Sequence, residues 1–468
     1  MLEKIRGKLY DDSKIDHNQL LFTTKGLWVL LVPIIIEQFL NALMGMVDSM
    51  MVSNVSSAAI SAVSLVDSIN VLVIQVFAAM ATGGTIICSQ YIGKKDEKRA
   101  NQAARQVFLT MLTIASVMMV GLILFRQPLL QSVFGEVDEA VMNYSMTYFF
   151  ITVLSYPFIA LFNAGAAFYR ASGHSKFPMQ VSVFSNLLNV IGNALFIFGL
   201  DMGVAGAALA TLLSRIICAS ILFYYLRKPK QVIVLRHYMR IKPHFKMIGM
   251  ILAIGIPAGI ENGMFQFGKL AIQSTVSQLG TTAIAAQAIT NILEVVNGMA
   301  GVGVGIGLMT VVGQCMGAGR REEAKYYIVK LTIYAELIII ASCLFTILIT
   351  KPVIWLAGME AESARMCWEM MVAITIVKPI AWVIAFVPAY GMRAAGDVKF
   401  CMTVSTITMW TCRVAVSVYL CRFIGIGPIG VWIGMFMDWS IRSVIFAWRY
   451  KSNRWLANQV IKEEGLAS

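Results

Sequence analysis

The sequence predicts an all-α integral membrane protein with twelve transmembrane helices in two six-helix lobes, related by a parallel pseudo-two-fold repeat. Composition, a series of apolar stretches and an internal duplication support this prediction. Hydrophobic residues make up 58% of the 468 residues and charged residues only 13%, and the mean hydropathy is +0.73. A soluble domain carries about 25% charged residues. We therefore expect lipid to cover most of the surface.

Twelve apolar stretches are each long enough to cross a bilayer as a helix, for which about 20 residues are needed. They cover residues 27–52, 58–82, 106–125, 143–165, 177–199, 204–226, 247–272, 284–308, 328–350, 369–391, 401–423 and 428–448.

Basic residues gather in alternate loops, such as 94–99, 227–246 and 320–325, whereas loops 53–57, 200–203 and 275–283 contain no Lys or Arg. The positive-inside rule then places both termini in the cytoplasm of a multi-pass protein of the inner or plasma membrane. The same clusters account for the net charge of +13, so the charge does not indicate nucleic-acid binding. Residues 1–26 are polar and contain no cleavage-site pattern, so we expect no cleaved signal peptide.

The chain repeats itself at an offset of 224 residues. Pro33 and Glu37 then fall on Pro257 and Glu261. The predicted organisation is a cytoplasmic segment (1–26), an N-lobe (27–226), a linker (227–246), a C-lobe (247–449) and a cytoplasmic tail (450–468). An even number of helices in each lobe gives both copies the same orientation, as in transporters built from parallel repeats. The prolines remove backbone hydrogen bonds, so we expect hinges at Pro33 and Pro257.

Three predicted helices carry polar stripes at one helical spacing, which puts each stripe on a single face. The stripes comprise Glu37, Asn41, Met44 and Asp48; Ser182, Asn186, Asn189 and Asn193; and Asn262, Gln266, Lys269 and Gln273. Charges within a bilayer are costly, so these residues should face a wet interior. We expect a substrate cavity lined by Asn41, Asn186, Glu261, Gln266, Lys269 and Glu294.

The acids of the first half show no obvious basic partner, whereas the second half has both signs of charge. A cation-coupling site is therefore expected in the first half. Its expected members are Asp48, Glu37, Asn189 and Asn193. Alternatively, the carboxylates snorkel or pair structurally, and the asparagines join helices. Asp67 is interpreted as structural.

In the second half, Lys269 is expected to neutralise Glu261 or Glu294, or to contact substrate. Asp438 and Arg442 are spaced for an internal ion pair. The eight cysteines and four histidines show no metal-ligand spacing. A phosphate-loop-like run at 263–269 lacks the Ser or Thr that such loops require. We therefore expect no enzyme activity, no cofactor, no metal site beyond possible Na⁺ near Asp48, and transport driven by an ion gradient.

Several motifs resemble the multidrug and toxic compound extrusion (MATE) family of bacterial cation-coupled antiporters over nearly the whole chain. They are Val47-Asp48-Ser49-Met50-Met51-Val52, Ser89-Gln90-Tyr91-Ile92-Gly93, Gly313-Gln314-Cys315-Met316-Gly317-Ala318, Arg170-Ala171-Ser172-Gly173, Arg393-Ala394-Ala395-Gly396 and the run 203–211. Asp48 matches the family's acidic residue on the first helix, and Asn189 matches its asparagine on the fifth. Asn193 stands where the family has an aspartate.

The resemblance implies alternating access and efflux of amphipathic, often cationic, drugs or toxic metabolites in exchange for inward Na⁺ or H⁺. The expected partners are these small molecules and membrane lipid, with no nucleic acid, and the protein is expected to be a monomer. One alternative function is a lipid-linked glycan flippase of the same superfamily, and another is a non-transporting membrane sensor or scaffold.

Overall fold

A computed structural model describes residues 9–52, 55–135, 137–229, 231–236, 238, 241–457 and 460–461. The predicted terminal segments and linker therefore lie partly outside the described residues. Within these ranges the chain forms helices joined by turns and short loops, without a strand. Contacts divide the chain into two units. The first unit comprises Ile36–Gly259, and the second comprises Met1–Ile35 and Ile260–Ser468.

The contact boundaries fall inside two long helices, α2 (Thr24–Val52) and α10 (Phe245–Ser277). Each boundary lies two residues beyond a proline, Pro33 or Pro257, that is contained in the helix. Glycines permit the close packing that defines the units. A Cβ on Gly303 would lie 2.9 Å from the Cα of Ile35 in the second unit, and one on Gly83 would lie 2.9 Å from the carbonyl oxygen of Ile251 in the first. The predicted hinge role of the prolines stays a prediction.

The first unit is completed by helices that follow α2 in the chain. They are α3 (Ser57–Gly93), α4 (Glu97–Leu124), α5 (Arg126–Phe134), α6 (Glu139–Leu154), α7 (Tyr156–Ala171), α8 (Lys176–Asn193) with its π-helical continuation η2 (Ala194–Gly199), and α9 (Gly203–Tyr225). Ser56 and Asp96 cap α3 and α4 by accepting hydrogen bonds from backbone N–H groups, as N-cap residues do. Helix α3 packs against α4, α6 and α7, and α8 packs against α9.

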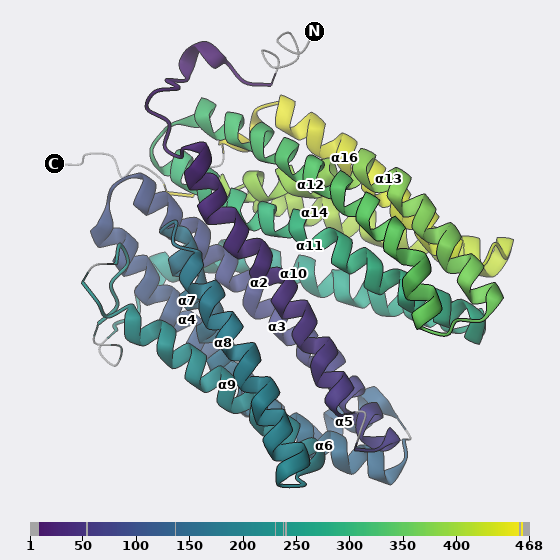
Figure 1. Cartoon of the computed structure of the whole chain (residues 1–468). Helices are drawn as coiled ribbons and strands as arrows, with labels where there is room; N and C mark the ends of the chain where they lie inside the picture. Colours follow the sequence, from purple (N-terminus) through teal and green to yellow (C-terminus); the bar gives the residue numbers. More distant parts are fainter. Residues whose placement is uncertain are drawn as a thin grey trace. The chain divides into compact units, whose positions relative to one another are not determined.

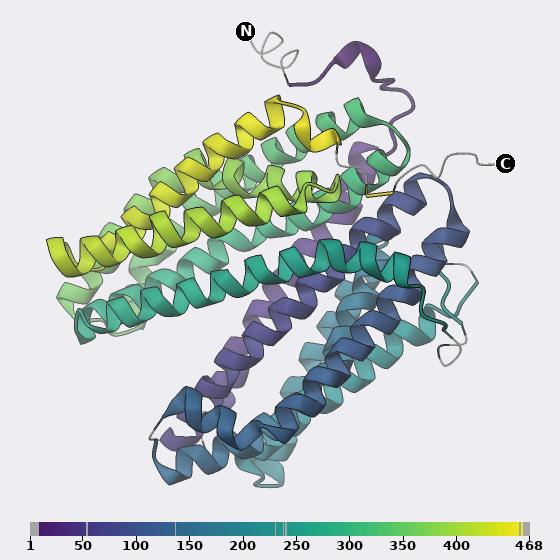
Figure 2. The same cartoon turned by 180° about the vertical axis from the view of Figure 1, so that it is seen from behind.

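The second unit contains long helices that run side by side in Figures 1 and 2. They are α11 (Thr281–Gly317), α12 (Arg321–Leu356), α13 (Ala361–Ala394), α14 (Val398–Thr408) and α16 (Ile429–Lys451). Between α14 and α16 the chain continues through the π-helical η4 (Met409–Val416), the short α15 (Ser417–Tyr419) and the π-helical η5 (Leu420–Ile424). Two short 3-10 helices, η1 (Asp12–Lys14) and η6 (Arg454–Ala457), lie near the ends of the described chain.

The predicted number of spanning helices is confirmed for the described residues. Eleven helices are long and apolar enough to span a membrane, and the bent pair α6 and α7 makes twelve. The predicted span 143–165 corresponds to this pair, which bends by 42° at Ser155. Pro157, in the first turn of α7, has no N–H with which to continue the ladder from α6.

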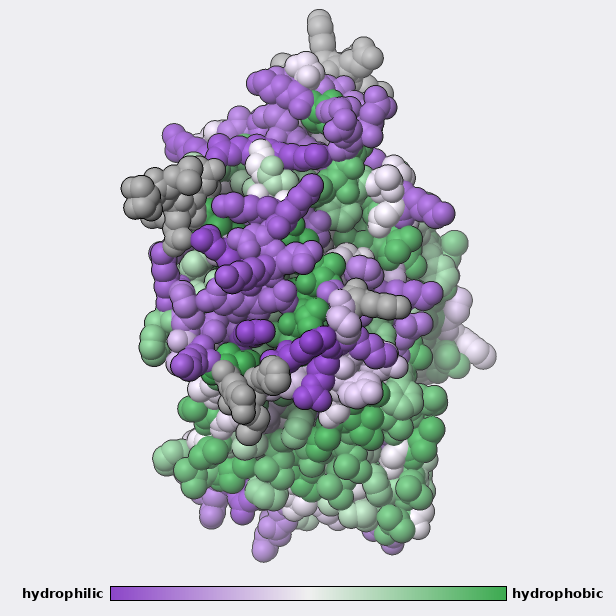
Figure 3. Space-filling model, turned by 90° about the vertical axis from the view of Figure 1, so that its left-hand side faces the viewer, coloured by the Kyte–Doolittle hydropathy of each residue, from purple (hydrophilic) through white to green (hydrophobic). Residues whose placement is uncertain are grey.

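Large apolar side chains point outward on the spanning helices. Val117 is 66% exposed and Leu348 is 75% exposed. On the face seen in Figure 3, hydrophilic residues gather in one zone and hydrophobic residues cover the zone beneath it. Such a surface would aggregate in water but is suited to lipid, so the structure is that of a multi-pass membrane protein.

Candidate functional site

Asp48 stands at the end of a chain of hydrogen bonds that joins α2, α8 and α9. The Nδ2 group of Asn193 donates to Asp48 Oδ1 at 2.7 Å and to Asn189 Oδ1 at 3.0 Å. The Nδ2 group of Asn189 donates in turn to Thr211 Oγ1 at 3.0 Å. Both asparagines are fully buried, whereas Asp48 is partly exposed. The network therefore connects a buried amide pair with one accessible carboxylate.

This network has oxygen atoms available for a small cation. The Oδ1 atom of Asn193 is buried without a hydrogen-bond partner among the described residues. A carboxylate has about four lone-pair positions, and Asn193 occupies one of those on Asp48. Carboxylate and amide oxygens are suitable ligands for hard cations. The π-helical η2 begins directly after Asn193, and such irregular turns occur frequently at functional sites. The predicted members Asp48, Asn189 and Asn193 are thus brought together.

A second polar network lies on α3, α6, α7 and α9. Asp67 accepts hydrogen bonds from Asn70 at 3.0 Å and from the Tyr148 hydroxyl at 3.3 Å. Tyr156 donates to Asn70 Oδ1 at 2.8 Å. The charge of Asp67 acts on Asp48. The assignment of Asp67 to a structural role stays a prediction, and its contacts place it beside the Asp48 network.

Arg215 was not identified from the sequence. It lies inside α9, and its Nη1 group donates to Ser155 Oγ at 2.6 Å. Its positive charge acts on both Asp48 and Asp67. The signal that could have revealed it is an arginine in the middle of an otherwise apolar span, where a charge requires a partner.

Glu37 lies outside the Asp48 network. It is 2% exposed, and both of its carboxylate oxygens are 3.2 Å from Nη1 of Arg170. The prediction that the acids of the first half lack a basic partner is therefore wrong for Glu37. Eleven residues along a helix correspond to about 16 Å, which separates Glu37 from Asp48 along α2. Of the four residues expected in the cation site, the structure brings three together, namely Asp48, Asn189 and Asn193.

Glu261 repeats this arrangement in the second unit. Its Oε1 atom is 2.6 Å from Nη2 of Arg393. Glu294 accepts from Nζ of Lys378 at 2.8 Å. Lys269 therefore forms an ion pair with neither acid, because each has a different partner, although the charge of Glu294 still acts on Lys269.

The predicted ion pair between Asp438 and Arg442 is confirmed. The two side chains are 2.8 Å apart and buried in α16. Both residues therefore enter the apolar interior as a compensated pair rather than as isolated charges.

The remaining residues of the predicted cavity fall into the two units. In the first unit, Asn186 donates to the carbonyl oxygen of Leu40 at 3.1 Å, so it joins α8 to α2, while Asn41 is exposed. In the second unit, Gln266 is partly exposed on α10, one turn before Lys269. Their role in binding substrate stays a prediction.

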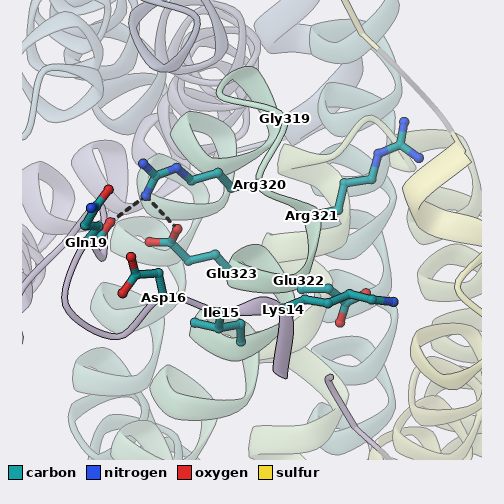
Figure 4. Close-up of a pocket in the computed structure, with 9 residues that line it drawn as sticks. All are labelled: Lys14, Ile15, Asp16, Gln19, Gly319, Arg320, Arg321, Glu322 and Glu323. Atoms are coloured by element: carbon teal, nitrogen blue, oxygen red, sulfur yellow. Dashed lines mark hydrogen bonds and ion pairs between the residues drawn. The ribbon is translucent and has the colours of Figure 1, made fainter. Parts of the chain in front are cut away.

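A pocket of about 400 Å³ lies where the N-terminal segment meets the start of α12 (Figure 4). Arg320 crosses it and donates to the carbonyl oxygen of Gln19 at 2.7 Å and to Glu323 at 3.0 Å. Glu323 also accepts from the backbone N–H of Leu21 at 2.6 Å. None of the predicted site residues lines this pocket. The hydrogen bonds of Arg320 and Glu323 attach the N-terminal segment to α12.

Comparisons with known proteins agree with this architecture. Residues 33–195 and 257–419 both match the MatE family. The chain is 27% identical over 444 residues to the uncharacterized transporter YisQ of Bacillus subtilis, covering 92% of this chain and 95% of that protein. It is also 27% identical over 448 residues to the probable multidrug resistance protein NorM of Thermotoga maritima, covering 94% and 95%.

A solved outward-facing structure of a multidrug resistance MATE family transporter superposes with a TM-score of 0.85 at 19% identity. The match covers 92% of this chain and 96% of that one, and it shows a shared fold. Since the family match includes both copies of the repeat, this chain belongs to the MatE family of multidrug and toxic compound extrusion transporters.

Proposed function

We propose that this protein is a secondary active efflux transporter that exchanges amphipathic, often cationic, compounds for inward-moving Na⁺ or H⁺ by alternating access. Family membership and the relative named as a multidrug resistance protein support the substrate class. The loop charges favour the inner or plasma membrane with cytoplasmic termini. We expect the transporter to act as a monomer. The observation that carries the proposal is the network of Asp48, Asn193 and Asn189, with its unpartnered amide oxygen.

The coupling step follows from the hydrogen bonds of Asn193. In the described arrangement its Nδ2 group donates to Asp48 and to Asn189. A Na⁺ ion at Asp48 would repel this donor and attract the free Oδ1 atom, which favours turning the amide over. A proton on Asp48 has the same consequence when the new O–H group faces Asn193, because the acid then donates where the carboxylate accepted. Either cation would break the bond to Asn189 and loosen the contact within α8. Cation binding would thereby bias the helix between two arrangements.

We place Glu37 outside the cation site and propose that it anchors Arg170. Glu261 anchors Arg393 in the same way. This assignment separates the acid that couples transport to the ion gradient, Asp48, from the acids that hold the helices together. It rests on the distances within each ion pair and on the separation of Glu37 from Asp48 along α2.

The test is dye efflux from proteoliposomes under Na⁺ and H⁺ gradients imposed separately. Asp48→Asn should abolish gradient-driven efflux of an ethidium-like dye while the dye still binds. Asp201→Asn is the matched control, because Asp201 is exposed in a loop and asparagine tolerates its positive φ. The control should transport like the unmodified protein. Full ion-coupled efflux by Asp48→Asn would refute the site assignment.

A further inference from the structure

Two basic side chains in the second unit have no acid of their own. The carboxylates whose charges act on Lys269 and Arg413 are Glu294 and Asp438. Glu294 is already paired with Lys378 and Asp438 with Arg442, each at 2.8 Å. The side chains of Lys269 and Arg413 form no ion pair and donate no hydrogen bond to another described residue. This part of the unit therefore contains two basic groups that no carboxylate pairs with directly.

The two side chains share one aromatic ring. The guanidinium carbon of Arg413 lies 4.9 Å from the centroid of Phe265, and Nζ of Lys269 lies 5.1 Å from it. Lys269 and Arg413 come close to each other because α10 packs tightly on η4 at Gly268. A Cβ on Gly268, next to Lys269, would overlap the side chain of Met409 and lie 3.4 Å from Val414. Lys269 and Arg413 thus form a cationic pair with an apolar ring between their helices.

Burial makes Arg413 the more informative member of this pair. It is 7% exposed, and its Nε group is buried without a partner among the described residues. A buried guanidinium is normally matched by an anion or by several hydrogen-bond acceptors. Lys269 is exposed, so a ligand can reach the pair from its side. Arg413 also lies in the π-helical η4, and π-helical turns often mark functional sites.

We propose that Lys269 and Arg413 bind the carboxylate of an aromatic amphiphile, with Phe265 against its apolar body. The planar guanidinium can donate two parallel hydrogen bonds to a carboxylate. This inference rests on the proposed efflux function and narrows its substrates to compounds that carry an anionic group beside any cationic one. The Asp48 network and this anion subsite lie in different units and recognise opposite charges.

The test compares rhodamine B with its ethyl ester, which differ in whether the carboxyl group is free. Binding of each dye to the full-length protein is measured by fluorescence anisotropy in phosphatidylcholine nanodiscs without an ion gradient. The acid should bind about tenfold more tightly than the ester, because a charge-assisted hydrogen bond contributes enough free energy for a factor of that size. Arg413→Gln and Lys269→Gln should each remove this preference while leaving ester binding unchanged. Arg422→Gln, an exposed arginine in η5 of the same span, should retain it.

Equal binding of acid and ester by the unmodified protein would overturn the inference, as would a preference that survives in both glutamine variants. If Arg413→Gln does not fold, the inference is judged from Lys269→Gln alone, because Lys269 is at an exposed position. Loss of the preference in phosphatidylglycerol discs would show that the pair holds a lipid headgroup instead. Because no gradient is applied, a failure here is distinct from a failure of ion coupling at Asp48.

Discussion

Replacing Glu37 with glutamine should destabilise the protein strongly. The pair with Arg170 is buried, since the side chains of Glu37 and Arg170 are 3% and 12% exposed. Removing one partner of a buried ion pair typically costs about 3–5 kcal/mol, because the remaining charge is left without compensation. At roughly 2 °C per kcal/mol for a unit of this size, the melting temperature should fall by about 6–10 °C.

The assay is thermal unfolding of the purified protein in detergent, followed by size-exclusion chromatography. Removing both charges, with Glu37→Gln and Arg170→Met together, should recover a large part of the loss, because no unpaired charge remains. Glu261→Gln is the matched variant, since Glu261 and Arg393 form the corresponding pair. A Glu37→Gln protein that melts like the unmodified one but has lost ion coupling would refute the anchoring role. Glu37 would then belong with Asp48 as a cation ligand.

Two further predictions concern packing and the N-terminal segment. Gly305→Ala should cost about 1–3 kcal/mol of stability, because the new Cβ would overlap the ring of Tyr390. Gly263→Ala, which meets nothing within 4 Å, should be neutral or stabilising, and equal melting temperatures for the two variants would contradict this. Tyr327→Phe removes a hydroxyl that accepts from Phe22 N–H at 3.0 Å and donates to its carbonyl oxygen at 2.7 Å. It should cost about 1–3 kcal/mol and speed proteolysis of the N-terminal segment, and unchanged cleavage would refute that role.

The helices could be predicted because their signal is local. Twenty apolar residues in sequence are sufficient to identify a span, whatever packs against it. The break at Ser155 was missed because the hydrophobic run continues across it and Pro157 is tolerated in the first turn of the following helix. Several helices are longer than the predicted spans. Helix α11, for example, extends from Thr281 to Gly317, whereas the predicted span covers residues 284–308.

Pairings between helices could not be predicted in the same way. The polar stripe on the fifth span predicted that Asn189 and Asn193 share a face, and the structure adds their bond to Asp48 on another helix. For Lys269 the sequence supplied a plausible acid on its own helix, Glu261, but the helix directs the two side chains to different neighbours. The partner of each charge depends on which helices pack together, and a local sequence pattern does not reveal that packing.

The two copies of the repeat share their ion pairs more closely than their polar stripes. Glu37 and Glu261 correspond at one offset, and their partners Arg170 and Arg393 correspond at nearly the same offset. Both pairs join the first helix of a copy to the end of a later helix, α7 or α13. Both arginines also leave Nε buried without a partner among the described residues.

A shared contact between distant segments indicates a requirement of the fold, because each unit has to hold the same two helices together. Among the described residues, Asp48 and the cationic pair over Phe265 have no such counterpart in the other unit. We infer that the repeated ion pairs stabilise the units, and that Asp48 in one unit and the cationic pair in the other distinguish what each unit binds.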